Sequence, residues 1–122
     1  MKKISALLFV SFIAFNLHAQ LSNTKWKGTL NIQGGMDVVF NFSHDTVDVT
    51  SPESGESLET SRYTASDSVM TFQKLYGGSQ CDTTIGKYKY LITGNEMTLS
   101  VISDSCYDRA EAIGTMKLEK KE

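Results

Sequence analysis

The residues best suited to chemistry in this chain are few. His44 lies in the run SHDTVD with Asp45 and Asp48, and one imidazole and two carboxylates at this spacing could form a weak metal site. Such a trio also arises by chance in polar turns, and we expect solvated turn residues here. No partner for general acid–base or nucleophilic catalysis stands beside His44 in the sequence. We therefore expect no catalytic residue, no metal and no cofactor, and we predict that the protein is not an enzyme.

A second polar cluster is the run SDSCYDR at residues 103–109. Asp104 and Asp108 could be imagined as a carboxylate pair for acid–base work. An arginine follows them at once, and a guanidinium pairs readily with carboxylates. We therefore interpret this loop as structural, with Asp104 or Asp108 partnering Arg109.

Residues 1–19 have the pattern of a secretory signal peptide. Lys2 and Lys3 precede an uncharged apolar run of about a dozen residues, and Ala19 supplies a small residue for cleavage. A helix that spans a bilayer needs about 20 apolar residues, so a lasting membrane anchor is the weaker interpretation. We predict a protein that is secreted or periplasmic, with no stable membrane anchor after cleavage.

Residues 20–122 are then a single domain, because their length supports no more than one. They carry 10 basic and 14 acidic residues, a formal charge of about −4. A mildly acidic domain without a basic stripe lacks the electrostatic attraction that a phosphate backbone requires. Nucleic acid is therefore not an expected partner.

The two cysteines, Cys81 and Cys106, both lie in this domain, and an exported chain meets an oxidising environment. Two cysteines allow one intramolecular pairing. The alternative is a pair of free thiols that bind a metal, but there is no CxxC spacing and no histidine near either cysteine. We predict a disulfide.

Strands are expected nearly throughout the domain, since apolar residues recur at every second position between short turn-forming runs. One example is MTLSVIS, which is predicted to place Met97, Leu99 and Val101 on one face. A single helical turn is expected between Asp104 and Glu111. The eight expected strands begin near residues 26, 36, 47, 58, 69, 86, 97 and 116.

Eight short strands joined mostly by tight turns favour an up-and-down antiparallel meander. Closing such a sheet into a barrel removes its free edges. A two-sheet β-sandwich is the alternative, although it usually needs longer crossing connections. The predicted fold class is therefore all-β, an eight-stranded antiparallel barrel.

Two segments resemble the lipocalin-like (calycin) barrels, in particular small secreted bacterial lipocalin-like domains. One is LSNTKWKGTL, with a tryptophan early in the first strand followed by a glycine, and the other is GKYKYLITGNEMTLSVISDSCYDRAEAIGTMKLEK. The second matches the family's closing pattern of a G-x-Y strand, an L-T-L strand, an acidic D-x-C loop, an arginine and a last strand. The chain departs from the family at Thr24, where a glycine is common, and in its shorter length.

The resemblance implies that Trp26 and Arg109 close one end of the barrel, because in such barrels the first-strand tryptophan packs against an arginine near the last strand. A guanidinium over an indole face gains about 0.5 to 2 kcal/mol. Arginine can also bury its stem while its charged tip finds partners.

The leading functional hypothesis is a carrier that binds a small hydrophobic or amphipathic molecule inside the barrel. The same residues at period two would also form an ordinary packed core. The candidate lining residues are Phe40, Phe42, Met70, Phe72, Tyr88, Tyr90, Met97 and Leu99.

The alternative is a protein-interaction or inhibitor module with a filled barrel, whose loops bind a protein partner. Tyr76, the GGSQ run, Tyr107 and the SPESGES turn would then be exposed and functional. A connected apolar cavity of about 300 Å³ or more would favour the carrier, and a solid interior would favour the module.

Overall fold

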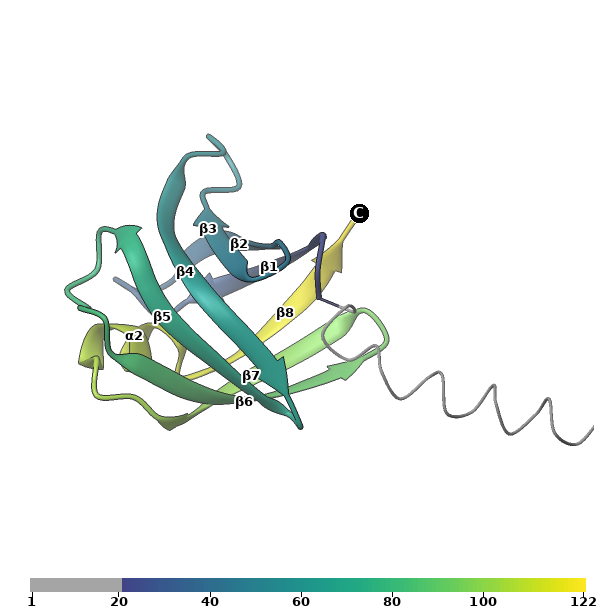
Figure 1. Ribbon diagram of the computed structural model, residues 1–122. Coiled ribbons are helices and arrows are strands. Elements are labelled where there is room, and N and C mark those ends of the chain that lie inside the picture. The colour runs from purple at the N-terminus through teal and green to yellow at the C-terminus, as the bar shows by residue number, and fades with distance from the viewer. Residues whose placement is uncertain (1–20) are drawn as a thin grey trace, which may run out of the picture.

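The computed structural model describes residues 21–122, so the expected signal peptide at residues 1–19 lies outside the described residues. The described chain forms a closed barrel of eight antiparallel strands, each paired with its neighbours in sequence, with β8 closing onto β1 (Figure 1). The predicted up-and-down barrel is confirmed, and the two-sheet sandwich is wrong. The elements are β1 Thr24–Leu30, β2 Met36–Phe42, β3 Thr46–Thr50, β4 Ser57–Ser66, β5 Val69–Gly77, β6 Ile85–Thr93, β7 Glu96–Ser103, α2 Tyr107–Ile113 and β8 Thr115–Lys121.

Alternation along the strands builds the core. In β6, Gly86, Tyr88 and Tyr90 are buried, while Lys87 and Lys89 between them are exposed. This pattern follows from the pleat, which points successive side chains to opposite faces of the sheet. All eight strands and α2 contribute to one hydrophobic cluster inside the barrel.

Tight turns hold neighbouring strands antiparallel. Asp67 and Ser68 join β4 to β5 with φ of 51° and 67°, the left-handed conformation that two-residue hairpin turns require. Gly94 takes φ of 61° in the turn between β6 and β7. Connections this short leave no room for a crossover, so the meander is set largely by local sequence.

One residue of β7 is more exposed than expected. Val101 was predicted to share a face with Met97 and Leu99, yet it is 40% exposed while the other two are fully buried. Its register is the expected one, because Val101 lies opposite the buried Tyr88 just as Leu99 lies opposite Tyr90. A bulge follows directly after Val101, since Lys87 lies opposite Ser103, and it disturbs the pairing at this end of the strand.

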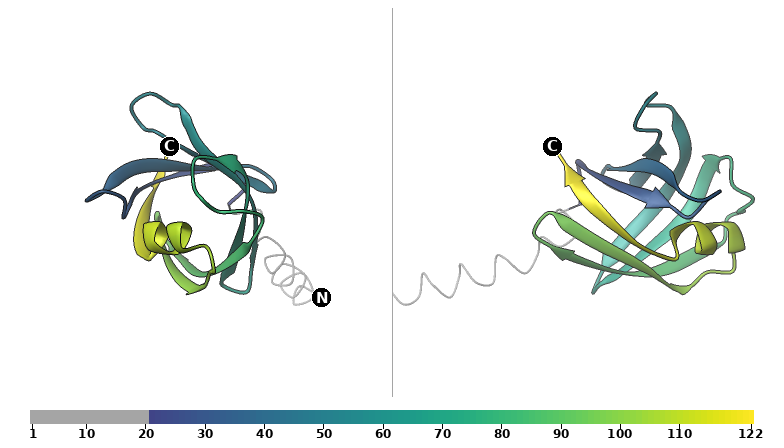
Figure 2. Two further views of the ribbon diagram at one scale, coloured as in Figure 1. Left: turned by 90° about the vertical axis from the view of Figure 1, so that its left-hand side faces the viewer. Right: turned by 180° about the vertical axis from the view of Figure 1, so that it is seen from behind.

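The two ends of the barrel differ. Helix α2 and the β5–β6 connection lie together at one end, which faces the viewer in the left panel of Figure 2. There the backbone amide of Asn31 donates to the carbonyl of Ala112 at 2.7 Å, tying the β1–β2 turn to the helix. At the opposite end, Leu21 is fully buried, and the hydroxyl of Tyr63 donates to the carbonyl of Ser43 at 2.8 Å. We call the end that carries α2 the α2 end.

Candidate functional site

A cavity of about 600 Å³ opens at the α2 end of the barrel. Its wall is mainly apolar and comes from strands β1 to β5, the β1–β2 turn, the β5–β6 connection and α2. The volume is within the range of small-molecule sites. The lining residues are Leu30, Asn31, Ile32, Gln33, Met36, Phe40, Val47, Val49, Leu58, Glu59, Ser61, Phe72, Gly78, Ser79, Asp108, Arg109, Glu111, Ala112 and Ile113.

Two of the eight predicted lining residues, Phe40 and Phe72, line this cavity. The other six belong to the packed core and do not line it. Four of them are on β6 and β7, from which the cavity draws no residue, and Phe42 and Met70 lie near the ends of β2 and β5 that are farther from α2. Period two identifies inward-facing side chains but not their depth along the barrel. The six core residues are Phe42, Met70, Tyr88, Tyr90, Met97 and Leu99.

Sequence reasoning missed much of the cavity wall. Leu30, Val49 and Leu58 are partly buried and stand near strand ends beside turns, while Ile113 comes from α2. The apolar side chains at strand ends were a usable signal for the three strand residues. The position of Ile113 depends on how α2 folds back across the barrel end, which strand alternation does not show.

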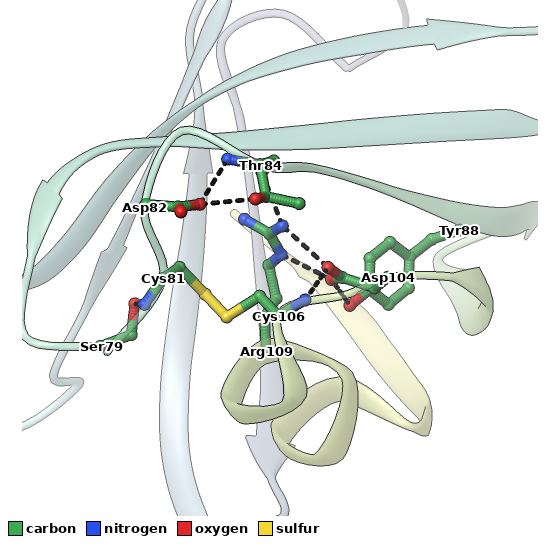
Figure 3. A network of polar contacts seen from close by, with 8 residues as sticks. All are labelled: Ser79, Cys81, Asp82, Thr84, Tyr88, Asp104, Cys106 and Arg109. Atoms are coloured by element: carbon green, nitrogen blue, oxygen red, sulfur yellow. Dashed lines mark hydrogen bonds and ion pairs between the residues drawn. A yellow bond between two sulfur atoms is a disulfide. The ribbon is translucent and has the colours of Figure 1, made fainter.

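A buried ion pair adjoins the cavity (Figure 3). The side chains of Arg109 and Asp104 are 5% and 0% exposed. The guanidinium grips the carboxylate in a bidentate manner, with Nε donating to Oδ2 at 2.6 Å and Nη2 donating to Oδ1 at 2.9 Å. Nη2 also donates to the carbonyl of Thr84 at 2.9 Å. The predicted pairing of Arg109 with one of the loop aspartates is therefore confirmed for Asp104.

Further donors converge on the same carboxylate. The hydroxyl of Tyr88 donates to Oδ2 of Asp104 at 2.6 Å, and the backbone amide of Cys106 donates to Oδ1 at 3.0 Å. Gly86 makes room for this cluster, since a Cβ there would collide with the Asp104 carboxylate. In the G-x-Y strand, the glycine thus leaves space for the Asp104 carboxylate and the tyrosine donates a hydrogen bond to it.

The hydrogen bonds set the charges of this cluster. Burial alone would raise the pKa of Asp104, but the bonds from Arg109, Tyr88 and the Cys106 amide outweigh it and lower that pKa. For Arg109, burial opposes the charged form, yet the bonded Asp104 carboxylate raises the net pKa. The pKa of the Tyr88 hydroxyl is raised by burial and by its bond to Asp104. Asp104 and Arg109 are therefore an ionised pair at neutral pH.

The expected packing of Arg109 against Trp26 stays a prediction. Trp26 is 2% exposed and donates its indole N–H to the hydroxyl of Thr24 at 2.9 Å. The donors of Arg109 that find partners are directed to Asp104 and Thr84. Such hydrogen bonds lie in the plane of the guanidinium and do not compete with an aromatic ring over its face. The buried tryptophan belongs to the core cluster.

Cys81 and Cys106 form a disulfide with a Cα–Cα distance of 5.4 Å, as predicted. The bond joins the β5–β6 connection to the residue that precedes α2. Both joined segments continue into the cavity wall, through Ser79 on one side and Asp108 on the other. The disulfide thus fixes two sides of the opening relative to each other.

Of the other polar candidates, His44, Asp45 and Asp48 do not line the cavity, whereas Asp108 does. His44 and Asp45 are exposed, and the carboxylate of Asp48 accepts hydrogen bonds from the hydroxyls of Ser57 and Thr60. Within residues 21–122, no group of three or more His, Cys, Asp and Glu residues is arranged to hold a metal ion. Asp108 pairs with the backbone amide of Gln80 at 3.1 Å, not with an arginine.

Comparison with protein-family models, curated proteins and solved structures found no match to this chain. What this site can bind is therefore argued from its geometry alone. Among the residues that the structure describes, no helix is long and apolar enough to cross a membrane.

Proposed function

We propose that this protein is a lipocalin-like carrier, exported by its N-terminal signal sequence, that binds a small hydrophobic or amphipathic molecule in the cavity at the α2 end. The observation that carries this proposal is the cavity of about 600 Å³ with its mainly apolar wall. It exceeds the roughly 300 Å³ at which a small-molecule site becomes the better interpretation. Binding would remove apolar ligand surface from water, worth about 25 cal/mol per Å² before the losses of association.

The disulfide also supports the proposal. Bonds of this kind persist in oxidising compartments outside the cytosol. By fixing Cys81 to Cys106 across the opening, the bond reduces the ordering that a ligand would otherwise have to impose on two cavity segments. A binding site that is already ordered binds its ligand more tightly than a flexible site of equal contact area.

Titration with the uncharged dye N-phenyl-naphthylamine, which fluoresces strongly in apolar surroundings, tests the proposal. Saturable one-site binding is expected. In Val49→Trp, an indole replaces a half-buried cavity residue, and the dye affinity should fall at least about tenfold. Leu91→Trp is the matched control, since Leu91 is 59% exposed on the outer barrel wall.

Two results would contradict the carrier function. One is dye binding that does not saturate, and the other is equal affinity in Val49→Trp and wild type. Native mass spectrometry of protein purified from its own host, followed by lipid extraction, supplies the complementary measurement. A reproducible bound species would give the ligand class directly.

The interaction module is the second candidate, favoured by two aromatic side chains at the α2 end. Tyr107 is 81% exposed and Tyr76 is 66% exposed, and exposed tyrosines are common in protein interfaces. A stable complex that is lost in Tyr107→Ser, together with absent dye binding, would favour this function over the carrier.

A further inference from the structure

One guanidinium nitrogen of Arg109 has no partner within residues 21–122. Nε and Nη2 donate to Asp104 and to the Thr84 carbonyl, whereas Nη1 is buried and makes no hydrogen bond to the described part of the chain. Buried polar groups nearly always find partners, and a charged donor is among the most costly to leave without one. A bound ligand could supply the acceptor that Nη1 lacks.

The position of Nη1 restricts where the acceptor can come from. Arg109 belongs to the cavity wall, whereas Asp104 and Thr84 do not line the cavity. Nη1 lies on the opposite side of the guanidinium from Asp104 (Figure 3). Because Arg109 itself lines the cavity, a molecule bound there is the candidate source of an acceptor for this nitrogen.

The charges of the wall decide which kind of acceptor fits. Among the described residues that line the cavity, Arg109 is the only basic one, and its charge is already balanced by Asp104. The lining also contains Glu59, Asp108 and Glu111. A ligand carboxylate would enter a region with a surplus of negative charge, whereas an uncharged oxygen meets no such repulsion.

We propose that the ligand of this cavity is an apolar molecule with an uncharged carbonyl-type oxygen, as in a ketone, ester or amide, which accepts a hydrogen bond from Nη1 of Arg109. This inference rests on the carrier function proposed above. The apolar body of the ligand lies against Phe40, Val49, Leu58 and Phe72.

Displacement of bound N-phenyl-naphthylamine by three molecules of equal chain length tests the inference. They are undecane, methyl nonyl ketone and undecanoic acid, compared at about pH 8, where the acid is ionised. The ketone should bind about tenfold more tightly than undecanoate, given the cost of several like charges nearby. In Arg109→Lys, the affinity of the ketone relative to that of the alkane should fall about tenfold, because a bond to a charged donor is lost.

If Arg109→Lys does not fold, infrared spectroscopy of the wild-type complex can test the hydrogen bond instead. The infrared carbonyl stretch of isotope-labelled methyl nonyl ketone bound to wild type should lie at lower wavenumber than in an alkane solvent, as expected for a hydrogen-bonded carbonyl. Glu111→Gln should raise the affinity of undecanoate relative to the ketone by about twofold to fivefold. Its matched control is Glu119→Gln on β8, an exposed residue outside the cavity lining, which should leave that ratio as in wild type.

The outcomes separate this inference from the carrier function. Absence of dye binding overturns both. Dye binding with a carbonyl stretch like that in alkane overturns the role of Nη1 alone, and so does an unchanged ketone-to-alkane ratio in Arg109→Lys. Undecanoate that binds as tightly as the ketone overturns the uncharged class, while the cavity remains a binding site.

Discussion

The buried pair of Asp104 and Arg109 makes a sharp prediction for Asp104→Asn. In wild type, both carboxylate oxygens accept from the guanidinium. Asparagine has nearly the same shape, but one of its two terminal atoms is an NH₂ donor. That group would face an N–H of the Arg109 guanidinium where the wild type has an acceptor. The buried guanidinium would also lose its counter-charge.

The size of the effect follows from the geometry. Two unit charges about 4 Å apart interact by about 4 kcal/mol at an effective dielectric constant of about 20. Breaking a buried pair by removing one partner typically destabilises a protein by about 3–5 kcal/mol. We therefore expect the free energy of unfolding to fall by about 3–5 kcal/mol, a large share of the roughly 5–15 kcal/mol available to a domain.

Urea denaturation followed by circular dichroism measures this change on oxidised protein. Asp108→Asn is the matched control: it makes the same chemical change four residues along the chain at an exposed carboxylate whose partner is a backbone amide, and its effect should stay below about 1 kcal/mol. A loss below about 1 kcal/mol in Asp104→Asn as well would refute the reasoning, because it would mean that water screens the pair.

Three further predictions concern the same end of the barrel. Because the pKa of folded Asp104 is lowered, its stabilising effect is complete above the ordinary carboxyl pKa of about 4 and is lost as pH falls through the folded value; the stability gap between wild type and Asp104→Asn, measured by urea denaturation, should therefore be constant from about pH 5 to 8 and shrink in acid. Gly86→Ala should lower stability by about 1–3 kcal/mol, since its Cβ would collide with the Asp104 carboxylate, whereas Gly78→Ala meets nothing within 4 Å and is the thermal-melting control; equal melting temperatures would contradict this. Replacing Cys81 and Cys106 with alanine opens a loop of 25 residues and should cost about 3.5 kcal/mol in the chain-entropy model, and an unchanged urea midpoint would show that the bond contributes nothing.

The strand order was predictable because the information is local. Alternation such as that of Lys87, Tyr88, Lys89 and Tyr90 identifies a half-buried strand, and turns such as the one at Gly94 leave the next strand only an antiparallel partner. The disulfide was predictable as well, since two cysteines allow only one pairing and the chain was predicted to be exported. Even the helical turn was expected close to its place, although α2 begins at Tyr107 and ends at Ile113.

Local pattern failed where residues distant in sequence compete for the same group. Arg109 had two candidate carboxylates in its own loop, Asp104 and Asp108, and the fold brings it to Asp104 and to the Thr84 carbonyl of the β5–β6 connection. The exposure of Val101 was not predictable from alternation either, because Val101 pairs with the buried Tyr88 and is still 40% exposed beside the bulge.

The all-β class, the meander, the disulfide and the pairing of Arg109 with a loop aspartate could be predicted from the sequence, because each follows from residues close together in the chain or from a pairing without alternatives. The place where the interior is hollow could be found only from the folded structure. Phe72 lines the cavity and Met70 does not, although both face inward from the same strand. Packing density depends on side chains from several strands and from α2 at one depth of the barrel, and a period of two cannot encode that depth.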